Sequence, residues 1–442
     1  MKRYLSNIQI WLIFFFLFGC RQRIVNKADV AVIIDFLNQI GNYQKLYLSD
    51  FVSELEYIPL ETGDKCLIGD VYDNNVIVTK SHIFIASQKY CYAFGRDGKF
   101  ITEIGHSGQG PGEYTVINTT TGIFVDEKRQ SLYLEIIPFA ILEYSWDGVF
   151  RRSIKLPTNK LGHYPTGVFF VRDSLFIGHN TNYSGDQEYH FFLFDISGKI
   201  IKTFDNHVKI ERSKIIWNSF EGSIKPFRLL ENIFVKEFPN DTLYCLNEHD
   251  ELIPQFVFNL GKYAYTKEKR ANNNPIEGTK DVIFIPHFMI PMITASNYIF
   301  FSVDPTELTY PISLPKGRVR KSVLPPGAVR VGYYDPDNPR ATPLGIYDTV
   351  NKTTRLLDTD PFSRMIGLIN DLDGGLSFWP FYFNSENELV DIYQAGKMKE
   401  YLTEEYFAAH EIRDSQANQK LREFLKTLDE DDNPVVVVGK MK

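Results

Sequence analysis

A hairpin pattern at Tyr90 to Gly105 (YCYAFGRDGKFITEIG) decides the fold. It consists of an apolar strand, a tight turn at Asp97-Gly98 and a second apolar strand. Two further segments repeat the pattern, Ala140 to Leu156 (AILEYSWDGVFRRSIKL) and Phe191 to Phe204 (FFLFDISGKIIKTF). Glycine supplies the positive φ that a two-residue primed turn needs, so each segment predicts a β-hairpin with such a turn.

The hairpins recur at a fixed spacing. Their turn glycines stand fifty residues apart, at Gly98, Gly148 and Gly198. Looser copies follow at Thr242 to Leu260 and Leu344 to Leu357. Other strands precede the hairpins, at Ile83 to Ala86, Leu132 to Leu134, Leu175 to Ile177 and Ile233 to Lys236. The repeating unit is therefore a small antiparallel sheet of about four strands.

Small sheets repeated at this period are the sequence signature of a β-propeller. The spacing predicts blades at 66–105, 113–157, 165–206, 224–261, 283–358 and 376–400. The expected fold class is all-β, a six-bladed β-propeller of four-stranded antiparallel blades. Two stacked β-sandwiches are the alternative that the same alternation allows, and the regular spacing favours the propeller.

The C-terminal tail changes period. Between Lys399 and Leu428, apolar residues at 421, 424, 425 and 428 have the spacing of an amphipathic helix, which Asn433-Pro434 ends. Val435 to Val438 follow as a strand that is apolar on both faces. Four exposed valines on an edge strand would promote aggregation, so this strand must pair inside a sheet. We predict that it closes the ring by pairing with the first or the last blade.

The N-terminus predicts export. Lys2 and Arg3 precede an apolar run, Ile10 to Phe18, that is too short to span a bilayer. Leu17-Phe18-Gly19-Cys20 then resembles the lipobox of bacterial lipoproteins, which predicts cleavage before Cys20 and its lipidation. The alternative is an ordinary secretory signal with an incidental cysteine. No acid follows between 21 and 27, which favours the periplasmic face of the outer membrane over the cell surface.

These patterns divide the chain into four segments: a lipoprotein signal peptide at 1–19, a tether at 20–42, the propeller at 43–400, and a C-terminal helix with its closing strand at 401–442. Cys66, Cys91 and Cys245 remain in the mature chain. Three cysteines allow at most one bridge, and we expect free buried thiols. The formal net charge of −7 excludes a nucleic-acid footprint.

Three motifs resemble those of six-bladed β-propeller lipoproteins of Bacteroidota-type bacteria: GHSGQGPGEY at 105–114, DLDGGLSFWP at 371–380, and the ending DNPV at 432–435 with KMK at 440–442. GQGPGEY is the most specific element, and the resemblance covers essentially the whole mature chain. The resemblance implies a fold and an envelope location, without a catalytic residue to carry over. Related NHL-like propellers mostly bind partners, whereas sugar-lactonase-like propellers use metal-held carboxylates in the central channel.

Candidate contact residues lie in two of these motifs. Glu113 and Tyr114 end the glycine-rich loop, where Glu113 is suited to hold backbone N–H groups or to meet a ligand at the channel mouth. Asp371 and Asp373 begin like a calcium loop, but the twelfth position is tyrosine and excludes an EF-hand. Trp379 is suited to stack on a sugar ring or to pack inside a blade.

We expect no cofactor, because no metal, phosphate-loop or nucleophile motif has the required spacing. The favoured hypothesis is a lipid-anchored binding or interaction module of the cell envelope, for a glycan or an envelope protein. Its anchor makes the membrane a partner. The alternative is a metal-dependent lactonase-like or hydrolase-like enzyme with a central-channel site. Three or more carboxylates or histidines converging on the axis would favour the enzyme, and aromatics with neutral polar groups would favour binding.

Overall fold

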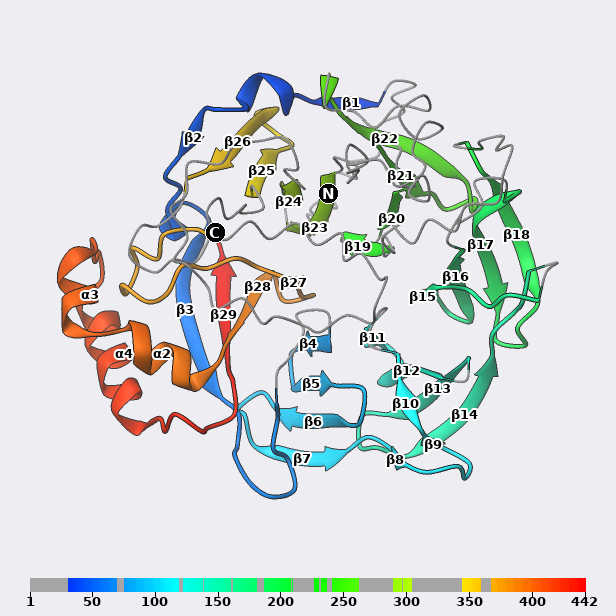
Figure 1. The fold of residues 1–442 in the computed structure, drawn as a ribbon, viewed down its shortest axis with the longest axis horizontal. Helices are drawn as coiled ribbons and strands as arrows, with labels where there is room; N and C mark the ends of the chain where they lie inside the picture. The colour runs from blue at the N-terminus through cyan, green and yellow to red at the C-terminus, as the bar shows by residue number, and fades with distance from the viewer. Residues whose placement is uncertain are drawn as a thin grey trace, which may run out of the picture.

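Six sheets surround a central axis as the blades of a propeller in the computed structural model (Figure 1). The structure describes residues 31–69, 75–118, 122–137, 139–159, 162–180, 187–207, 209, 226–229, 232–236, 241–261, 289–295, 297–303, 344–358 and 367–442. The predicted all-β, six-bladed β-propeller is confirmed, and the alternative of two stacked sandwiches is wrong.

The first three blades are antiparallel, and each is continuous in sequence. Blade 1 contains β4 (Val76–Val78), β5 (His82–Ala86), β6 (Cys91–Gly95) and β7 (Phe100–Glu103); blade 2 contains β11 (Ile123–Asp126), β12 (Ser131–Ile137), β13 (Ala140–Ser145) and β14 (Phe150–Lys155); blade 3 contains β15 (Gly167–Arg172), β16 (Leu175–His179), β17 (Tyr189–Asp195) and β18 (Ile200–Asp205). The connection from blade 1 to blade 2 adds β8 (His106–Ser107), β9 (Glu113–Tyr114) and β10 (Val116–Ile117), the last paired with the end of β12.

Blades 4 and 5 each gain a parallel outer strand from the N-terminal region. Blade 4 contains β19 (Phe227–Leu229), β20 (Asn232–Lys236), β21 (Thr242–Leu246), β22 (Leu252–Phe258) and β1 (Val32–Ile34); blade 5 contains β23 (Met289–Ala295), β24 (Tyr298–Val303), β25 (Leu344–Asp348), β26 (Thr353–Leu357) and β2 (Tyr43–Gln44). The structure thus differs from the tether expected over 20–42, because 32–34 lies in a sheet. Two short 3₁₀ helices, Leu37–Gln39 and Leu48–Asp50, lie along this path.

Blade 6 joins the two ends of the chain. Its strands are β27 (Tyr382–Phe383), β28 (Glu388–Tyr393), β29 (Val435–Met441) and β3 (Val52–Pro59), in that order. The C-terminal β29 is hydrogen-bonded between β28 and the N-terminal β3, which run side by side with it in Figure 1. The four valines are buried, so the predicted closing strand is confirmed in the last blade.

Arg96 of blade 1 ties the closed blade to its neighbour. Its Nη2 atom lies 2.9 Å from an oxygen of Glu56 on β3 and 3.3 Å from an oxygen of Glu388 on β28. These two strands flank β29, so one guanidinium contacts both partners of the closing strand. The Leu60 N–H also donates to the carbonyl of Pro434, 3.2 Å away, just before β29 begins.

The repeated glycine turns have a different geometry from the one predicted. Gly98 has φ +78° and donates its N–H to the carbonyl of Gly95, and the strand register shifts by one residue beside the turn. The expectation of a two-residue primed turn is wrong, since the loop is one residue longer and its glycine forms a β-bulge. A Cβ at Gly98 would lie 2.1 Å from the Pro59 carbonyl oxygen, so glycine also permits contact with blade 6.

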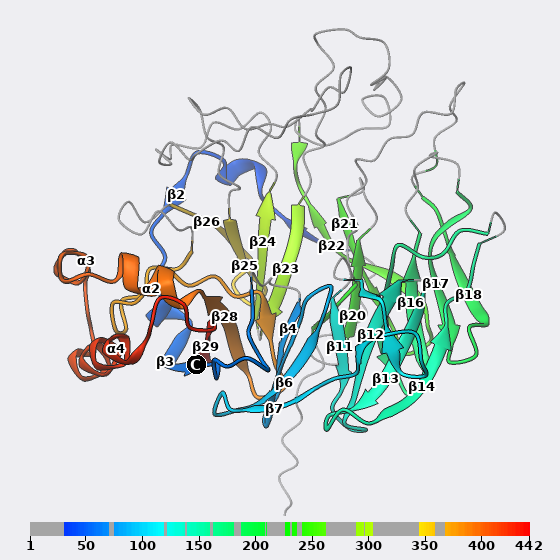
Figure 2. The same ribbon diagram turned by 60° about the horizontal axis from the view of Figure 1, so that its bottom comes forward.

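The tail forms three helices where one was expected: α2 (Ala395–Tyr401), α3 (Glu404–Ala409) and α4 (Ser415–Thr427). Thr403 accepts from the N–H of Tyr406 and caps α3, and Asp414 accepts from two N–H groups and caps α4. These capping residues start new helices inside the segment that the periodicity assigned to one. The helices lie on the outer side of blade 6 in both ribbon views (Figure 2).

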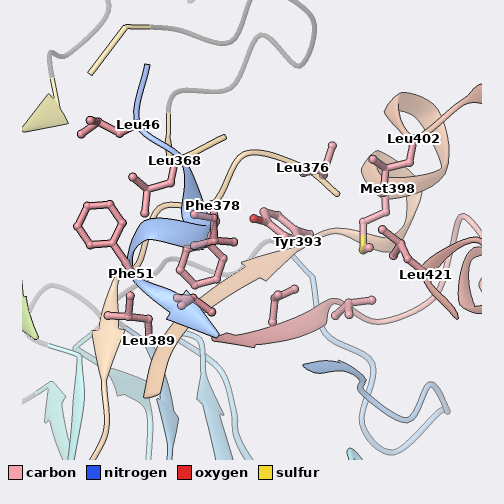
Figure 3. Close-up of a cluster of buried hydrophobic side chains, with 14 of the residues drawn as sticks. Leu46, Phe51, Leu368, Leu376, Phe378, Leu389, Tyr393, Met398, Leu402 and Leu421 are labelled. Carbon is pink, nitrogen blue, oxygen red and sulfur yellow. The ribbon is translucent and has the colours of Figure 1, made fainter. Parts of the chain in front are cut away.

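Buried apolar side chains fill the spaces between blades and attach the helices. Ile177 of blade 3 and Val235 of blade 4, for example, belong to one cluster. A larger cluster joins blades 5 and 6 to the helices, and Figure 3 shows Met398, Leu402 and Leu421 beside Tyr393 of β28. The helices are therefore part of the core and not a separate appendage.

Cys66, Cys91 and Cys245 are buried and free, as expected. Burial raises the pKa of the Cys245 thiol to about 11, which keeps it protonated at neutral pH. No helix in the described ranges is both long and apolar enough to cross a membrane. The segment predicted to be a signal peptide and Cys20 lie outside the described residues.

We predict that Val437→Asp lowers the free energy of unfolding by about 3 to 5 kcal/mol, because it buries an unpaired charge in the closing strand. Thermal and urea unfolding of the mature domain measure this, and both should still show the ring unfolding as a single transition. Lys440→Gln, at an exposed position of the same strand, is the control and should change stability by less than about 0.5 kcal/mol. Equal effects of the two substitutions would contradict a closing role for β29.

Candidate functional site

The two ends of the propeller differ in chemistry. In each blade the chain runs outward from the inner strand, so all inner strands point the same way. We name the end that carries the turns at 79–81, 127–130, 173–174 and 384–387 the turn face. The opposite end, where β5, β12, β16 and β20 finish, is the loop face.

The inner strands are mostly aliphatic and aromatic. They read VIV, IFVD, GVFFVR, FRL, MIPMITA and YF from blade 1 to blade 6, and their ionisable acid and base residues are Asp126, Arg172 and Arg228. Within the described residues, no three His, Cys, Asp or Glu side chains lie close enough together to hold a metal ion.

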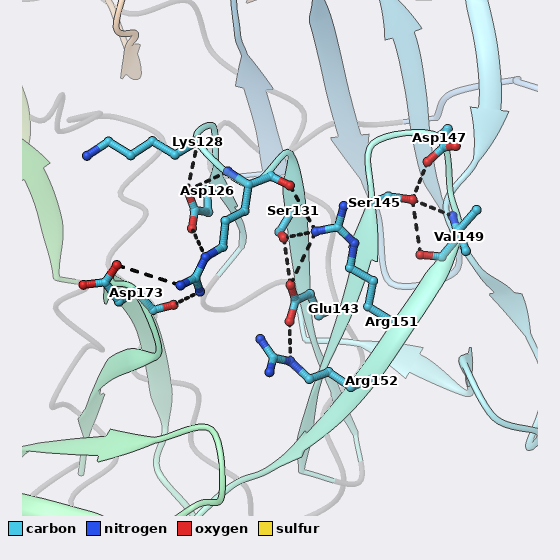
Figure 4. Close-up of polar contacts among 11 residues, drawn as sticks. Asp126, Lys128, Ser131, Glu143, Ser145, Asp147, Val149, Arg151, Arg152 and Asp173 are labelled. Atoms are coloured by element: carbon cyan, nitrogen blue, oxygen red, sulfur yellow. Dashed lines mark hydrogen bonds and ion pairs between the residues drawn. The ribbon is translucent and has the colours of Figure 1, made fainter.

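Charges on the turn face pair across blade boundaries. Arg129 of blade 2 lies 3.9 Å from Asp126 and 3.8 Å from Asp173 of blade 3 (Figure 4). The Ser385 hydroxyl of blade 6 donates to Glu127 of blade 2 over 2.9 Å, which spans the position of blade 1. These turn-face side chains therefore join blade 2 to blades 3 and 6.

A second network lies inside blade 2. Glu143 is buried and accepts from the Ser131 hydroxyl at 2.7 Å and from Arg152 Nε at 2.5 Å (Figure 4). Arg151 lies 3.7 Å from the same carboxylate. Two cations and a hydroxyl satisfy both carboxylate oxygens, so this buried acid has a structural explanation.

The loop face carries a series of buried ionisable residues at equivalent positions. Glu135, His179 and Lys236 are each the fifth residue of the second strand in blades 2, 3 and 4, counted from Ser131, Leu175 and Asn232. All three side chains are buried. We call these three residues the ionisable belt. Buried ionisable groups cluster at functional sites, so the belt is the strongest candidate site in the described chain.

Two belt residues have identified partners. Glu135 accepts from the Asn118 side chain at 2.9 Å, and its backbone carbonyl accepts from the Asn118 N–H at 2.7 Å. His179 Nδ1 lies 3.1 Å from the Thr166 hydroxyl. Burial lowers the pKa of His179 to about 4, so this imidazole is neutral at physiological pH.

Lys236 differs from the other two. Its Nζ atom is buried and has no hydrogen-bond partner among the described residues. Burial lowers the pKa of its ammonium group to about 8, and the nearby Asp241 carboxylate acts in the opposite direction. The sequence signal for the belt is a polar or charged residue at the end of an apolar strand, and it becomes visible only when blades are aligned.

A stacked aromatic pair lies on the same face, with the Phe139 ring exposed and the Tyr164 ring partly buried. Phe139, in the turn between β12 and β13, stacks on Tyr164, in the connection to blade 3, with ring centres 4.2 Å apart and planes inclined by 16°. Phe139 is 39% exposed, and the adjacent Ile137 is 43% exposed. The loop face thus combines a stacked aromatic surface with a buried belt of ionisable groups.

The structure places the two glycine-loop candidates differently. Glu113 is partly exposed, accepts from the Gly110 N–H at 2.7 Å and lies 2.9 Å from His106 Nε2. These bonds, the Gly110 N–H first, lower the pKa of Glu113. It therefore holds the loop, which is one of its two expected roles. Tyr114 is buried between blades 1 and 2, so its ring contributes to the core.

The acidic candidates lie in the interior, between blade 6 and the helices. Asp371 accepts from the Ser49 N–H at 3.0 Å and the Ser49 hydroxyl at 2.6 Å, and its second oxygen also lies 2.8 Å from Arg413 Nε. Asp373 accepts from Gly375, Asn370 and Tyr57. Protein donors thus occupy both Asp371 oxygens and the Oδ1 oxygen of Asp373, so the pair anchors the loop.

Trp379 is half-buried. Its backbone N–H donates to Asp391 at 2.9 Å, and its ring lies edge-on to Phe300 with centres 5.4 Å apart. The ring packs against the cluster that joins blades 5 and 6 to the helices. Of the two roles expected for Trp379, stacking on a sugar ring or packing inside the protein, this position corresponds to packing.

The closed ring of six sheets defines the class as a six-bladed β-propeller. The chain belongs to the family described as Domain of unknown function (DUF4934), whose model matches residues 31–440. No curated protein matches it significantly in sequence.

A solved structure shows the same fold. A protein from Bacteroides fragilis, described as exported, is 16% identical and has a TM-score of 0.61, covering 93% of this chain and 100% of its own. A member of the duf4221 family from Bacteroides vulgatus is 10% identical, with a TM-score of 0.39, and covers 69% of this chain and 84% of its own. At 16% identity, the likeness to the exported protein extends to the fold and not to the site.

The Asp373 anchor predicts a pH dependence. Burial raises the pKa of Asp373 to about 6, so the folded chain holds this proton more tightly than the unfolded chain. The stability that the folded chain gains from this bound proton is complete below the ordinary carboxyl pKa. It is lost as the pH rises through about 6. We expect the stability of the wild type relative to Asp373→Asn to fall by about 2 kcal/mol between pH 4 and pH 7.

Urea unfolding at several pH values measures this difference. Asp414→Asn, which changes an exposed helix cap, is the matched control and should not alter the slope over the same range. A constant difference between wild type and Asp373→Asn across the range would contradict the proposed state of the anchor.

Proposed function

We propose that this chain is a lipid-anchored glycan-binding module of the cell envelope. The observation that carries the proposal is the stack of the exposed Phe139 ring on the partly buried Tyr164 ring at the loop face. Pyranose rings present apolar C–H faces and polar edges, and aromatic rings with nearby hydrogen-bonding groups complement both.

Polar groups flank the stack. The His163 N–H donates to the Asn159 side chain at 2.9 Å, and the Asn159 N–H donates to the His163 carbonyl at 2.9 Å. The pair fixes the turn beside Tyr164 and leaves the His163 imidazole exposed. An aromatic platform and an exposed hydrogen-bonding ring therefore lie within one turn of each other in sequence.

The proposed anchor comes from the sequence. The lipobox-like Leu17 to Cys20 follows a basic and apolar leader, and residues 20–31 separate Cys20 from the first strand. An exported protein of the same fold supports an envelope location for this chain. The lipid would keep the propeller at the periplasmic face of the outer membrane.

We predict that Phe139→Ala and Tyr164→Ala each weaken glycan binding about tenfold, because loss of a stacked aromatic removes about 1.4 kcal/mol. Binding of the mature protein to an immobilised panel of bacterial and host glycans, followed by titration calorimetry, measures this. Ile201→Ala removes an apolar side chain that is 57% exposed on the outer strand of blade 3 and should leave the affinity unchanged.

Two outcomes would oppose the proposal. Binding that survives both aromatic substitutions would move the site elsewhere. Turnover of lactones or esters that is abolished by a chelator and restored by one metal would favour the metal-dependent enzyme instead.

We also predict that Cys20→Ser leaves the protein soluble in the periplasm, since a single residue supplies the acyl attachment. Fractionation after a salt wash distinguishes the variant from the wild type, which should pellet with the outer membrane. Cys66→Ser is the control and should stay with the membrane. Membrane association of Cys20→Ser after the wash would contradict the anchor.

A further inference from the structure

The outermost strand of blade 4 is an open apolar edge. β1 reads VII from Val32 to Ile34 and lies on the outer rim of the ring, beside β22 (Figure 1). Its middle residue, Ile33, is 65% exposed, as much as any large apolar side chain in the described residues. Within those residues, no strand pairs with the outer side of β1.

The outermost strands of four other blades carry charges. They are β7, β14, β18 and β3, and their charged residues are Glu103 in β7, Arg151, Arg152 and Lys155 in β14, Lys202 and Asp205 in β18, and Glu54 and Glu56 in β3. Charges on an edge strand discourage pairing with a second sheet, because a partner strand would have to bury them. The sixth edge, β2 of blade 5, is only two residues long. β1 is therefore the one apolar edge of three residues without a charge in the described chain.

The backbone of Ile33 faces this open edge. The Ile34 carbonyl accepts from the Asn259 N–H at 2.9 Å, just beyond the end of β22, so the peptide groups of Ile34 face that strand. Successive residues of a strand direct their N–H and C=O groups to opposite sides. The N–H and C=O of Ile33 therefore face away from β22, where no strand of the described chain pairs with them.

We propose that two copies of this chain associate through β1, which pairs antiparallel with the β1 of the second copy. The two-fold axis passes beside Ile33, so each Ile33 donates its N–H to the Ile33 carbonyl of the other copy. The two exposed side chains then lie opposite each other on one face of the joined sheet and cover each other. The two copies of blade 4 become one continuous sheet.

The occupant is a second copy because the edge is complementary to itself. In a two-fold contact the same residue lies on both sides, and an uncharged apolar strand can face its own copy without repulsion. The pairing uses the open edge of both copies, so the assembly closes at a dimer and does not grow into a fibre. A contact this small predicts a weak dimer that forms as the protein concentration rises.

The tether is compatible with this dimer. The 12 residues from 20 to 31 separate Cys20 from β1. Fully extended, they span about 40 Å, so two copies joined at their β1 strands can be attached to one membrane. The dimer itself does not depend on the lipid or on a glycan, which allows it to be tested apart from the proposed function.

The first test is disulfide trapping in the chain from residue 20 with Cys20→Ser, which removes the lipid and its thiol. Ile33→Cys should form a disulfide-linked dimer about tenfold faster than Val350→Cys, because facing residues of an antiparallel pair have Cα atoms at a separation that a disulfide spans. Val350 is the matched control, since it is also 65% exposed but lies in a turn of blade 5. Cys66, Cys91 and Cys245 are buried and should not react.

The second test is charge pairing at the same position, measured by analytical ultracentrifugation. Ile33→Asp and Ile33→Lys should each stay monomeric at concentrations at which the parent protein dimerises, because like charges then face each other. An equal mixture of the two should form the dimer again, because opposite charges face each other across the pair. Ile201→Asp, at a 57% exposed position of β18, should dimerise like the parent.

Three results would overturn the proposal. The first is equal oxidation rates for Ile33→Cys and Val350→Cys. The second is a parent protein that stays monomeric at every concentration, and the third is a dimer that persists in both Ile33→Asp and Ile33→Lys.

Discussion

The ring depends on the hydrogen bonding of β29 between β28 and β3. A propeller leaves its first and last blades with open edges until the ring closes, and unpaired strand edges are both unstable and prone to aggregation. Here the C-terminal strand inserts between a strand that precedes it by about forty residues and one from the N-terminal region. The four consecutive valines make that insertion favourable, because both of their faces lie in apolar contacts.

Closure explains how the rest of the molecule is organised. Arg96 links the closed blade to blade 1, and the glycine at 98 allows the turn of blade 1 to approach the end of β3. The C-terminal helices lie between β28 and β29 in sequence, so their packing and the Asp371 and Asp373 anchor fix the path that returns the chain to blade 6. In the closed ring, charges on the turn face pair between blades, whereas the loop face carries the buried ionisable belt.

Local chemistry made much of the fold predictable. The turn glycines of blades 1 to 3 repeat because each of these turns has a positive φ at the same place. The valine run has a single favourable environment in an all-β protein. The parallel strands β1 and β2 were not predictable, since two or three residues carry no period. Neither were the three helices, because capping by Thr403 and Asp414 overrode one continuous periodicity.

The site was less predictable than the fold. Asp371 is hydrogen-bonded to Ser49, which is 322 residues away in sequence. Its structural role could therefore not be predicted from the residues next to it in the chain. Glu135, His179 and Lys236 became equivalent only once the strand registers were known. Each of the three is a polar or charged residue at the end of an apolar strand. One such residue can be explained in many ways, whereas three at equivalent positions of consecutive blades have fewer explanations.

Hydrogen exchange of the native protein tests the central claim, that the closing strand makes the ring one cooperative unit. If β29 makes the ring one cooperative unit, the amides of Val436 to Val438 exchange with the same free energy of opening as amides in the middle strands of blades 2 and 3, such as Leu142 and Leu193. Exchange of β29 at a clearly lower free energy, with the other blades still protected, would contradict it.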